Sequence, residues 1–368
     1  MTTSLAIEGI SLRGVRNLQG LDLEFSRTLN VLFGGNGQGK TSLLEALCIA
    51  VAGRSFRTDQ LREVVQTGAD GFRVSAAVDD DGLTREQKVT FGGRARQLSI
   101  DGKRVASAAA FAIRTPIVVF YPNDLELVTG PATNRRTLLD RIALYTDPST
   151  QDSRLAYTRA LRHRQQLLDS SPSDNKSLPA FETIVAEQGL RYATAHADAA
   201  RNLQVHLLSA FAELCPEPLE LQVGFTGIEL SDAEAYRNEL IQRRSADRKR
   251  GHATFGPHRD ELELDLSGRS ARHHASQGQQ RLLALAMKLA ELRCIEAARH
   301  VHPILLLDDV ASELDLDRTA RVFARLHGAP SQVFLSTPRP DLLKALPILA
   351  DGTQHFEVRS GSISLAGN

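Results

Sequence analysis

Apolar residues gather in short continuous runs and at helically spaced positions along the chain, a mixture that predicts an α/β protein. The run LNVLF (29–33) is apolar at four of five positions and is typical of a buried strand. After a polar interval, apolar residues recur at helical spacing, namely at Leu43, Leu44, Leu47, Cys48 and Val51. Two further runs, RTPIVVF (114–120) and HPILLLDD (302–309), predict additional buried strands.

The pattern between these runs changes twice, which predicts two lobes. Residues 54–125 are β-rich, with FRVSAAVDD, REQKVTF and RQLSIDGKRV separated by Asp-Gly and Gly-Gly turn signals. From about 127 to 250 the pattern is helical, with one helix in 149–169 and another of roughly 35 residues, about 50 Å long, from Leu178. ATFGPHRDELELDLSGRSA (253–271) predicts a β-hairpin. We therefore expect one lobe from residues 1–126 plus 251–368 and a helical lobe from 127–250.

The segment FGGNGQGKTS (33–42) lies between the first strand and the first helix and contains four glycines and one lysine. Glycine allows left-handed backbone angles and close approach to a ligand, so such a loop can direct bare N–H groups at a phosphate. The spacing Gly34-x4-Gly39-Lys40-Thr41 matches the phosphate-binding loop at every fixed position. The loop predicts binding of a nucleoside triphosphate by Gly34, Gly35, Asn36, Gly37, Gln38, Gly39, Lys40 and Thr41.

Composition excludes several classes of protein. With 368 residues, 42% hydrophobic and 24% charged, the chain is typical of a globular protein of one large or two ordinary domains. It contains neither an apolar stretch long enough for a membrane span nor a signal peptide, so we expect no membrane association and a cytoplasmic location. The three cysteines are dispersed, and Cys48 and Cys294 lie in apolar helical patterns, which predicts buried thiols.

An acidic pair follows the apolar strand at 304–307. A carboxylate at the end of a buried strand can hold Mg²⁺, which is the role expected of Asp308. The neighbouring Asp309 is the candidate base that orients or deprotonates the attacking water. The alternative is a buried strand followed by a capped helix, since aspartate and serine are also capping residues. The phosphate loop upstream favours the metal site.

The segment SQGQ, containing Ser276, Gly278 and Gln279, precedes a long helix marked by Leu282, Leu285, Leu289 and Leu292. A serine hydroxyl, a glycine and a helix N-terminus form a second anion site. Because the phosphate loop already holds one nucleotide, this second element predicts two chains that each cap the other's nucleotide. The alternative is an ordinary helix cap by Ser276.

The ordered set of phosphate loop, SxGQ element and Asp-Asp strand followed by SELD (312–315) resembles the ABC-type ATPase heads. Within that class the chain is similar to the bacterial RecF family. The members of this family are related to the SMC heads but lack the long coiled coil. The resemblance rests on five further blocks, namely SLRGVRNLQGLDLEF, GRSFRT, FYPNDLELVTGPATNRRTLLD, TFGPHRDELEL and SQGQQRLLALAMKLAE. It implies an α/β, ABC-type (SMC-like) ATPase head with a second, mainly helical lobe.

The resemblance also implies a function. RecF proteins bind DNA as ATP-dependent homodimers, act with RecR and RecO, and help to load RecA near single-stranded gaps. It implies ATP and Mg²⁺ as ligands, Thr41 and Asp308 at the metal, and Lys40, Asp309 and the partner chain's Ser276 in catalysis. Asp309 stands where ABC heads usually carry glutamate, and QVFLSTPRP (332–340) has no switch histidine, so we expect slow hydrolysis suited to a switch.

DNA contacts are expected from local rather than total charge. The net charge is zero, aromatic content is 5% and tryptophan is absent, so contact with the DNA backbone must dominate over base stacking. The candidates are Arg135 and Arg136, and the cluster Arg248, Lys249 and Arg250.

Two rival functions remain open at this level. One is the nucleotide-binding subunit of a membrane transporter, which the helical lobe and the missing switch histidine disfavour. The other is a DNA-binding scaffold in which ATP is structural and is not hydrolysed.

Overall fold

The computed structural model describes residues 5–170, 176–215, 218–309, 331–338 and 352–366. They divide into two compact units, one of residues 1–125 with 281–368 and one of residues 126–280. None of the described helices is long and apolar enough to cross a membrane.

The first unit is built on a six-stranded sheet that is parallel except at one edge. Its order is β15 (Ser362–Leu365), β14 (Gln354–Arg359), β3 (Leu29–Phe33), β13 (Val333–Thr337), β12 (Ile304–Asp308) and β8 (Ile117–Phe120). Only β15 runs antiparallel to its neighbour. The strands predicted from the apolar runs are confirmed, and they are buried on both faces as in other parallel sheets.

A second sheet of the same unit is antiparallel, and the predicted β-rich region supplies four of its strands, while β1 and β2 come from the N-terminal segment before the phosphate loop. Its order is β2 (Leu21–Glu24), β1 (Leu5–Arg13), β4 (Phe72–Asp80), β5 (Leu83–Phe91), β6 (Arg96–Ile100) and β7 (Lys103–Arg104). Burial alternates along β4 and β5, so one face of this sheet supplies a core. The unit also contains η1 (Leu61–Val64), α2 (Ala108–Ala112), η2 (Pro122–Leu125) and most of α10 (Gln277–Arg299).

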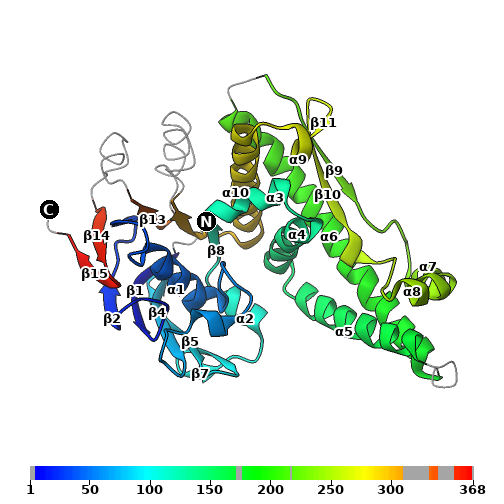
Figure 1. Ribbon diagram of the computed structural model, residues 1–368, viewed down its shortest axis with the longest axis horizontal. Helices are drawn as coiled ribbons and strands as arrows, with labels where there is room; N and C mark the ends of the chain where they lie inside the picture. Colours follow the sequence, from blue (N-terminus) through cyan, green and yellow to red (C-terminus); the bar gives the residue numbers. More distant parts are fainter. Residues whose placement is uncertain (1–4, 171–175, 216–217, 310–330, 339–351, 367–368) are drawn as a thin grey trace. The chain divides into compact units, whose positions relative to one another are not determined.

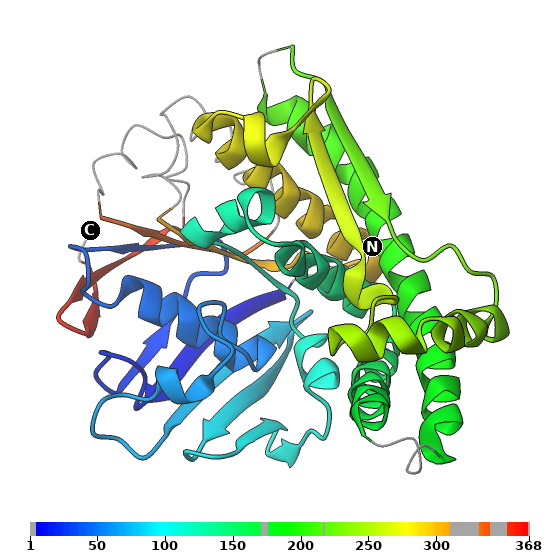
Figure 2. The same ribbon diagram turned by 45° about the vertical axis from the view of Figure 1, so that its right-hand side comes forward.

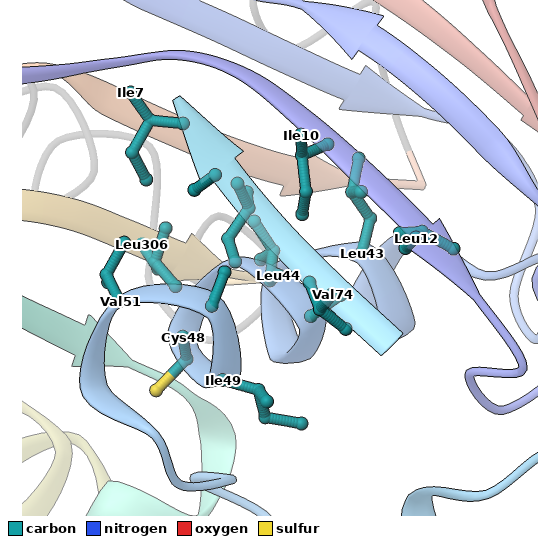
Figure 3. Packing of buried hydrophobic residues seen from close by; sticks show 14 of the residues in the cluster. Ile7, Ile10, Leu12, Leu43, Leu44, Cys48, Ile49, Val51, Val74 and Leu306 are labelled. Carbon is teal, nitrogen blue, oxygen red and sulfur yellow. The ribbon is translucent and has the colours of Figure 1, made fainter. Parts of the chain in front are cut away.

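Helix α1 (Lys40–Ala52) packs against both sheets, which the sequence pattern did not predict. Every residue of α1 except Thr41 is buried, whereas the helical spacing had indicated a single apolar face. In Figure 3 the labelled side chains of α1 share one cluster with residues of β1, β4 and β12, such as Ile10, Val74 and Leu306. The helix that follows the phosphate loop is therefore held on opposite sides (Figure 1). Cys48 and Cys294 are buried, as predicted.

The second unit is mainly helical. Its helices are α3 (Glu126–Thr129), α4 (Ala132–Thr146), α5 (Thr150–Asp169), α6 (Leu178–Leu214), α7 (Ala233–Gln242), α8 (Arg244–Arg250), η4 (Pro257–Arg259) and α9 (Ala271–His274). The two long predicted helices correspond to α5 and to the 37-residue α6. These helices contact each other extensively, and α7 packs on α6 (Figure 2).

The predicted hairpin belongs to this helical unit and not to the lobe of residues 1–126 plus 251–368 in which it was expected. Strand β10 (Glu261–Leu266) pairs with β11 (Arg269–Ser270) on one side and with β9 (Leu221–Thr226) on the other. The register with β9 runs from Glu261 opposite Thr226 to Leu266 opposite Leu221, so residues 251–280 stay with the helices. The expected second boundary at 250/251 therefore differs from the division at 280/281.

A buried ion pair network joins four helices of the second unit. The Arg164 guanidinium of α5 is fully buried and donates to the Asp247 carboxylate of α8 at 2.7 Å and to the Leu240 carbonyl of α7 at 2.7 Å. Glu182 of α6 lies 3.4 Å from Arg164 and also accepts from Arg244. Asp247 further accepts from the Thr254 backbone N–H at 2.8 Å. This network therefore positions α8 and the segment after it.

Replacing Arg164 with alanine should strongly destabilise this unit. The substitution leaves Asp247 and Glu182 buried with fewer partners, and such a loss costs about 3–5 kcal/mol. Arg159→Ala, on the exposed face of the same helix, should change stability by less than about 0.5 kcal/mol. Chemical denaturation of both variants measures this difference. Equal stability of the two variants would contradict the structural role of the network.

Candidate nucleotide site

The phosphate loop is delivered by strand β3 and ends where α1 begins. Gly34, Gly37 and Gly39 have φ values of +148°, +75° and +124°, which disfavour residues with a side chain. A Cβ atom at Gly34 would lie 2.3 Å from the Val358 carbonyl oxygen of β14, whereas one at Gly37 would meet nothing within 4 Å. Gly34 is thus required by packing as well as by backbone angle, and Gly37 by its angle alone.

Residues far away in the sequence hold the loop in place. The turn between β14 and β15 donates two backbone hydrogen bonds to Gln38, from Ser360 N to Oε1 at 2.6 Å and from Gly361 N to the carbonyl oxygen at 2.8 Å. Asn17 donates to the Gly37 carbonyl at 3.2 Å and accepts from the Ser42 hydroxyl at 2.9 Å. Gln38 therefore anchors the loop through its side chain.

Lys40 lies at the centre of the loop. Its Nζ donates to the carbonyl oxygens of Gly34 and Gly35, both at 2.8 Å, and the side chain is largely buried. Burial lowers the pKa of this ammonium, while the nearby carboxylates of Asp309 and Asp308 oppose that shift. The loop therefore places a cation where a phosphate can take over from neutral carbonyl acceptors.

Three oxygen-bearing side chains meet at the end of β12. The Asp308 carboxylate accepts from the Thr41 hydroxyl at 2.9 Å and from the Ser336 hydroxyl at 2.6 Å. Burial raises the pKa of Asp308, and these two hydrogen bonds counteract part of the rise. Carboxylate and hydroxyl oxygens are hard ligands of the kind that Mg²⁺ takes together with substrate phosphates. The donor set therefore fits the metal expected from the sequence.

Ser336 is a site residue that the sequence analysis missed. It lies one residue before the end of β13, beside β12, and is in register with Asp308. Its hydroxyl also accepts from the Asp309 backbone N–H at 3.1 Å. The available signal was the polar residue closing the run QVFLS, because adjacent parallel strands bring their carboxyl ends together.

Asp309 directly follows β12, at the carboxyl end of that strand. Its φ of +54° lies in the left-handed region that aspartate tolerates better than most residues. Asp309 lines the same cavity as Lys40, Thr41 and Asp308. This is the neighbourhood required of the proposed base.

The cavity has a volume of about 890 Å³, and the described residues that line it all belong to the first unit. That volume lies within the range of small-molecule sites. Two arginines in its wall were not predicted from the sequence, Arg16 and Arg57. They add two permanent positive charges to a cavity that also contains Lys40.

Both arginines are held by Glu45 of α1, which is fully buried. Arg16 donates to both carboxylate oxygens of Glu45 at 2.8 Å, and Arg57 donates at 3.2 Å. Burial opposes ionisation of Glu45, but hydrogen bonds from Arg16 and Ser55 outweigh it and hold its pKa below the ordinary value. A lone glutamate inside the apolar helix of SLLEALC was the available sequence signal.

The SQGQ element forms a reciprocal helix cap in the second unit. The Gln279 N–H donates to the Ser276 hydroxyl at 3.3 Å, and the Ser276 N–H donates to the Gln279 side chain at 2.8 Å. This is a capping box, so the helix-cap interpretation is confirmed for the isolated chain. It leaves the proposed role of Ser276, Gly278 and Gln279 across a dimer as a prediction.

The predicted basic contacts separate into buried and exposed residues. Arg135 is 5% exposed and donates to Glu261 at 2.7 Å and to the Leu127 and Gly130 carbonyls at 3.1 Å. Its guanidinium is committed inside the unit, which argues against the expected DNA contact. Arg248, Lys249 and Arg250 are all exposed, although Arg248 also donates to the Leu168 carbonyl at 2.6 Å. The SELD segment (312–315) lies outside the described residues.

Comparison with known proteins gives a consistent assignment. Residues 6–353 match the model of the RecF/RecN/SMC N-terminal domain family. The DNA replication and repair protein RecF of Myxococcus xanthus is 36% identical over 361 residues, which cover 95% of this chain and 94% of that protein. The chain belongs to the RecF family.

Solved structures extend the RecF assignment to the fold. A structure described as the recombination mediator protein RecF with ATP in the RecFOR pathway aligns with a TM-score of 0.88 and 27% identity, covering 100% of this chain and 99% of that one. An Smc head domain of Pyrococcus furiosus, 16% identical, aligns with a TM-score of 0.56 over 98% of this chain and 96% of that one. The fold is therefore that of an ABC-type, SMC-like ATPase head with a helical lobe.

Alanine substitutions at two loop glycines should have unequal effects. Gly34→Ala creates an overlap with the backbone of β14 and should destabilise the protein by roughly 2–4 kcal/mol. Gly37→Ala has open space and should cost only about 1 kcal/mol of backbone strain. Denaturant unfolding of the two variants measures the contrast. A Gly37→Ala variant that is the less stable of the two would show that the described loop packing is wrong.

Proposed function

We propose that this chain is an ATP-dependent DNA-binding protein of recombinational repair and replication restart. ATP closes a homodimer on DNA near single-stranded gaps, the complex helps to load the recombinase RecA with RecR and RecO, and slow hydrolysis releases it. The observation that carries the ATPase part is the junction of Lys40, Thr41, Asp308 and Asp309 in one cavity. Family membership supports the repair part.

Lys40, Arg16 and Arg57 have different roles in binding the phosphates of the nucleotide. Lys40 exchanges two neutral carbonyl acceptors for oxygens of the β- and γ-phosphates, which makes stronger, charge-assisted hydrogen bonds. Arg16 and Arg57, oriented by Glu45, add positive charge at the same cavity. Transition-state charge on the transferred phosphoryl group is stabilised by such fixed cations.

Thr41 and Asp308 would hold Mg²⁺, and Ser336 keeps the Asp308 carboxylate oriented. When bound, the metal neutralises phosphate charge. Asp309 orients the attacking water or accepts its proton, and its side chain is one methylene shorter than glutamate. Both this length and the absence of a switch histidine at the end of β13, where Thr337 and Pro338 stand, favour a slow switch over a motor.

Replacing Asp309 with asparagine should separate ATP binding from hydrolysis. The amide keeps the shape of the side chain but cannot accept the proton, so turnover should fall by about 100-fold or more. Lys40, Thr41 and Asp308 remain, so ATP should still bind and the dimer should persist. Steady-state phosphate release and size measured with ATP report the two effects. Turnover at the wild-type rate would exclude Asp309 as the base.

That assay also tests the scaffold alternative. A scaffold with structural ATP shows no turnover in the wild-type protein, with or without DNA. Wild-type turnover that Asp309→Asn removes therefore excludes it.

Mixing two inactive variants tests whether each site is shared between chains. Lys40→Ala and Ser276→Arg should each be inactive alone, but a mixed dimer has one site with both lesions and one with neither. Random 1:1 mixing makes about half of the dimers mixed, so about a quarter of wild-type ATPase should return if the sites are independent. Ser276→Arg alone should still bind ATP, because its phosphate loop is intact.

The doubly substituted chain provides the matched control. Mixed 1:1 with wild type, it should leave about a quarter of full activity if sites are shared, because every mixed dimer then carries one lesion per site. If each chain completes its own site, the same mixture retains about half. Failure of the first mixture at every ratio, with about half retained in the second, would contradict the shared site.

A further inference from the structure

The GPHRD motif (256–260) builds a turn of the helical unit in which only Arg259 is exposed. The Tyr157 hydroxyl donates to His258 Nδ1 at 2.6 Å, and His258 Nε2 donates to the Ala253 carbonyl at 3.1 Å. Asp260 is buried and accepts from His196 Nδ1 at 2.9 Å. Arg259, between these two anchored residues, is exposed. The motif therefore holds the backbone on both sides of an outward-facing arginine.

The anchoring is specific to the small and polar residues of the turn. Gly256 has φ +139°, and a Cβ atom there would lie 2.1 Å from the Tyr157 hydroxyl. His196 is fully buried between the carboxylates of Asp260 and Asp140, and its Nε2 lies 3.1 Å from Asp140. Burial disfavours the charged ring, but hydrogen bonds to both carboxylates raise the pKa of His196 overall. The turn is thereby connected to α4 and α6.

Arg259 lines a cavity of about 530 Å³ within the helical unit. Two further guanidinium groups line it, Arg136 from α4 and Arg162 from α5, together with the imidazoles of His252 and His258. Among the described residues that line this cavity, none carries a carboxylate. Three permanent positive charges from three segments of the chain therefore converge on one concavity.

The three arginines differ in how they are held. Arg136 donates to the Asp260 carbonyl at 2.9 Å and to the Thr133 hydroxyl at 3.0 Å, so neutral acceptors fix its position. Within the described part of the chain, neither Arg162 nor Arg259 takes part in an ion pair. Guanidinium groups donate in a planar fork that matches phosphate oxygens, and an anion in this cavity relieves their mutual repulsion.

Positive charge continues beyond the cavity, which favours a polymer with repeated phosphates over a single ion. Gly251 and His252 of the cavity wall directly follow the exposed Lys249 and Arg250 at the end of α8. The buried pair of Arg164 and Asp247 fixes α8 to α5, the helix that carries Arg162. A lone phosphate can use only the concavity, whereas a nucleic acid backbone can contact both the concavity and its basic edge.

We propose that this cavity, lined by Arg136, Arg162 and Arg259, seats a phosphodiester group of the DNA backbone. Arg162 and Arg259 are the two direct contacts, and Arg136 is the pre-positioned third cation. This assignment rests on the DNA binding of the proposed function and gives that function a surface in the helical unit. It also assigns a role to the GPHRD motif, which presents Arg259.

The test compares two full-length double variants that remove the same charge. Arg162→Gln/Arg259→Gln removes the proposed contacts, and Arg191→Gln/Arg269→Gln removes two exposed arginines of the same unit that do not line the cavity. Binding of a fluorescent duplex oligonucleotide is measured with ATP across a series of salt concentrations. ATP affinity is measured in parallel, and it should equal the wild-type value in both variants.

The cavity variant should flatten the slope of log affinity against log salt by about one unit for each DNA-bound chain, because each cavity seats one phosphate. Its affinity at 0.1 M salt should fall by about tenfold or more. The control variant should keep the wild-type slope. An unchanged slope in the cavity variant, with wild-type protein binding DNA normally, overturns this assignment alone. Absence of DNA binding by the wild type with ATP overturns the proposed function and this assignment together.

A second arm distinguishes DNA from a small phosphate ligand. Pyrophosphate binding is measured by calorimetry on Lys40→Ala protein, in which the phosphate loop is disabled, with and without the Arg162→Gln/Arg259→Gln changes. Pyrophosphate binding that needs these two arginines, together with an unchanged DNA salt slope, assigns the cavity to a small phosphate compound and overturns the proposal. A flattened DNA slope supports it.

Discussion

The burial of α1 between two sheets is the constraint on which the nucleotide site depends. A helix with apolar residues on every side after its first turn cannot remain in water, so one sheet must cover each side of it. Its N-terminus is thereby fixed at the carboxyl end of β3, and the phosphate loop has to span that junction. The glycines at 34, 37 and 39 take the angles that this short connection requires. The packing of the core thus determines the geometry of the phosphate loop.

Charged groups in the site are balanced within the protein itself. The Asp308 carboxylate accepts hydrogen bonds from the hydroxyls of Thr41 and Ser336. Lys40 donates to two carbonyl oxygens, and Glu45 orients Arg16 and Arg57. Lys40 and Asp308 have neutral partners, which bind them more weakly than a phosphate or a metal ion would, whereas Arg16 and Arg57 stay paired with the Glu45 carboxylate. Ligand binding therefore exchanges hydrogen bonds within a preformed cavity and needs little reorganisation of side chains.

The helical unit uses buried charges for a different purpose. Arg164 with Asp247 and Glu182, and His196 with Asp140 and Asp260, join helices distant in sequence. Buried ion pairs are weak sources of net stability but leave few alternative arrangements, because a mispaired charge is costly. Both networks end next to exposed basic residues, Lys249 and Arg250 in one case and Arg259 in the other. The buried networks thereby fix the backbone that carries these exposed basic side chains.

The sequence by itself determined those features that local pattern decides. Continuous apolar runs specified β3, β8 and β12, helical spacing specified α5 and α6, and glycine spacing specified the phosphate loop with Lys40 and Thr41. Only the tertiary structure decided which distant residues meet. Strand register places Ser336 beside Asp308, and Arg135 forms an ion pair with Glu261. Pairing of β10 with β9 assigns residues 251–280 to the helical unit. These contacts depend on pairing and packing between segments far apart in the chain, and the amino-acid pattern of either segment alone does not encode its partner.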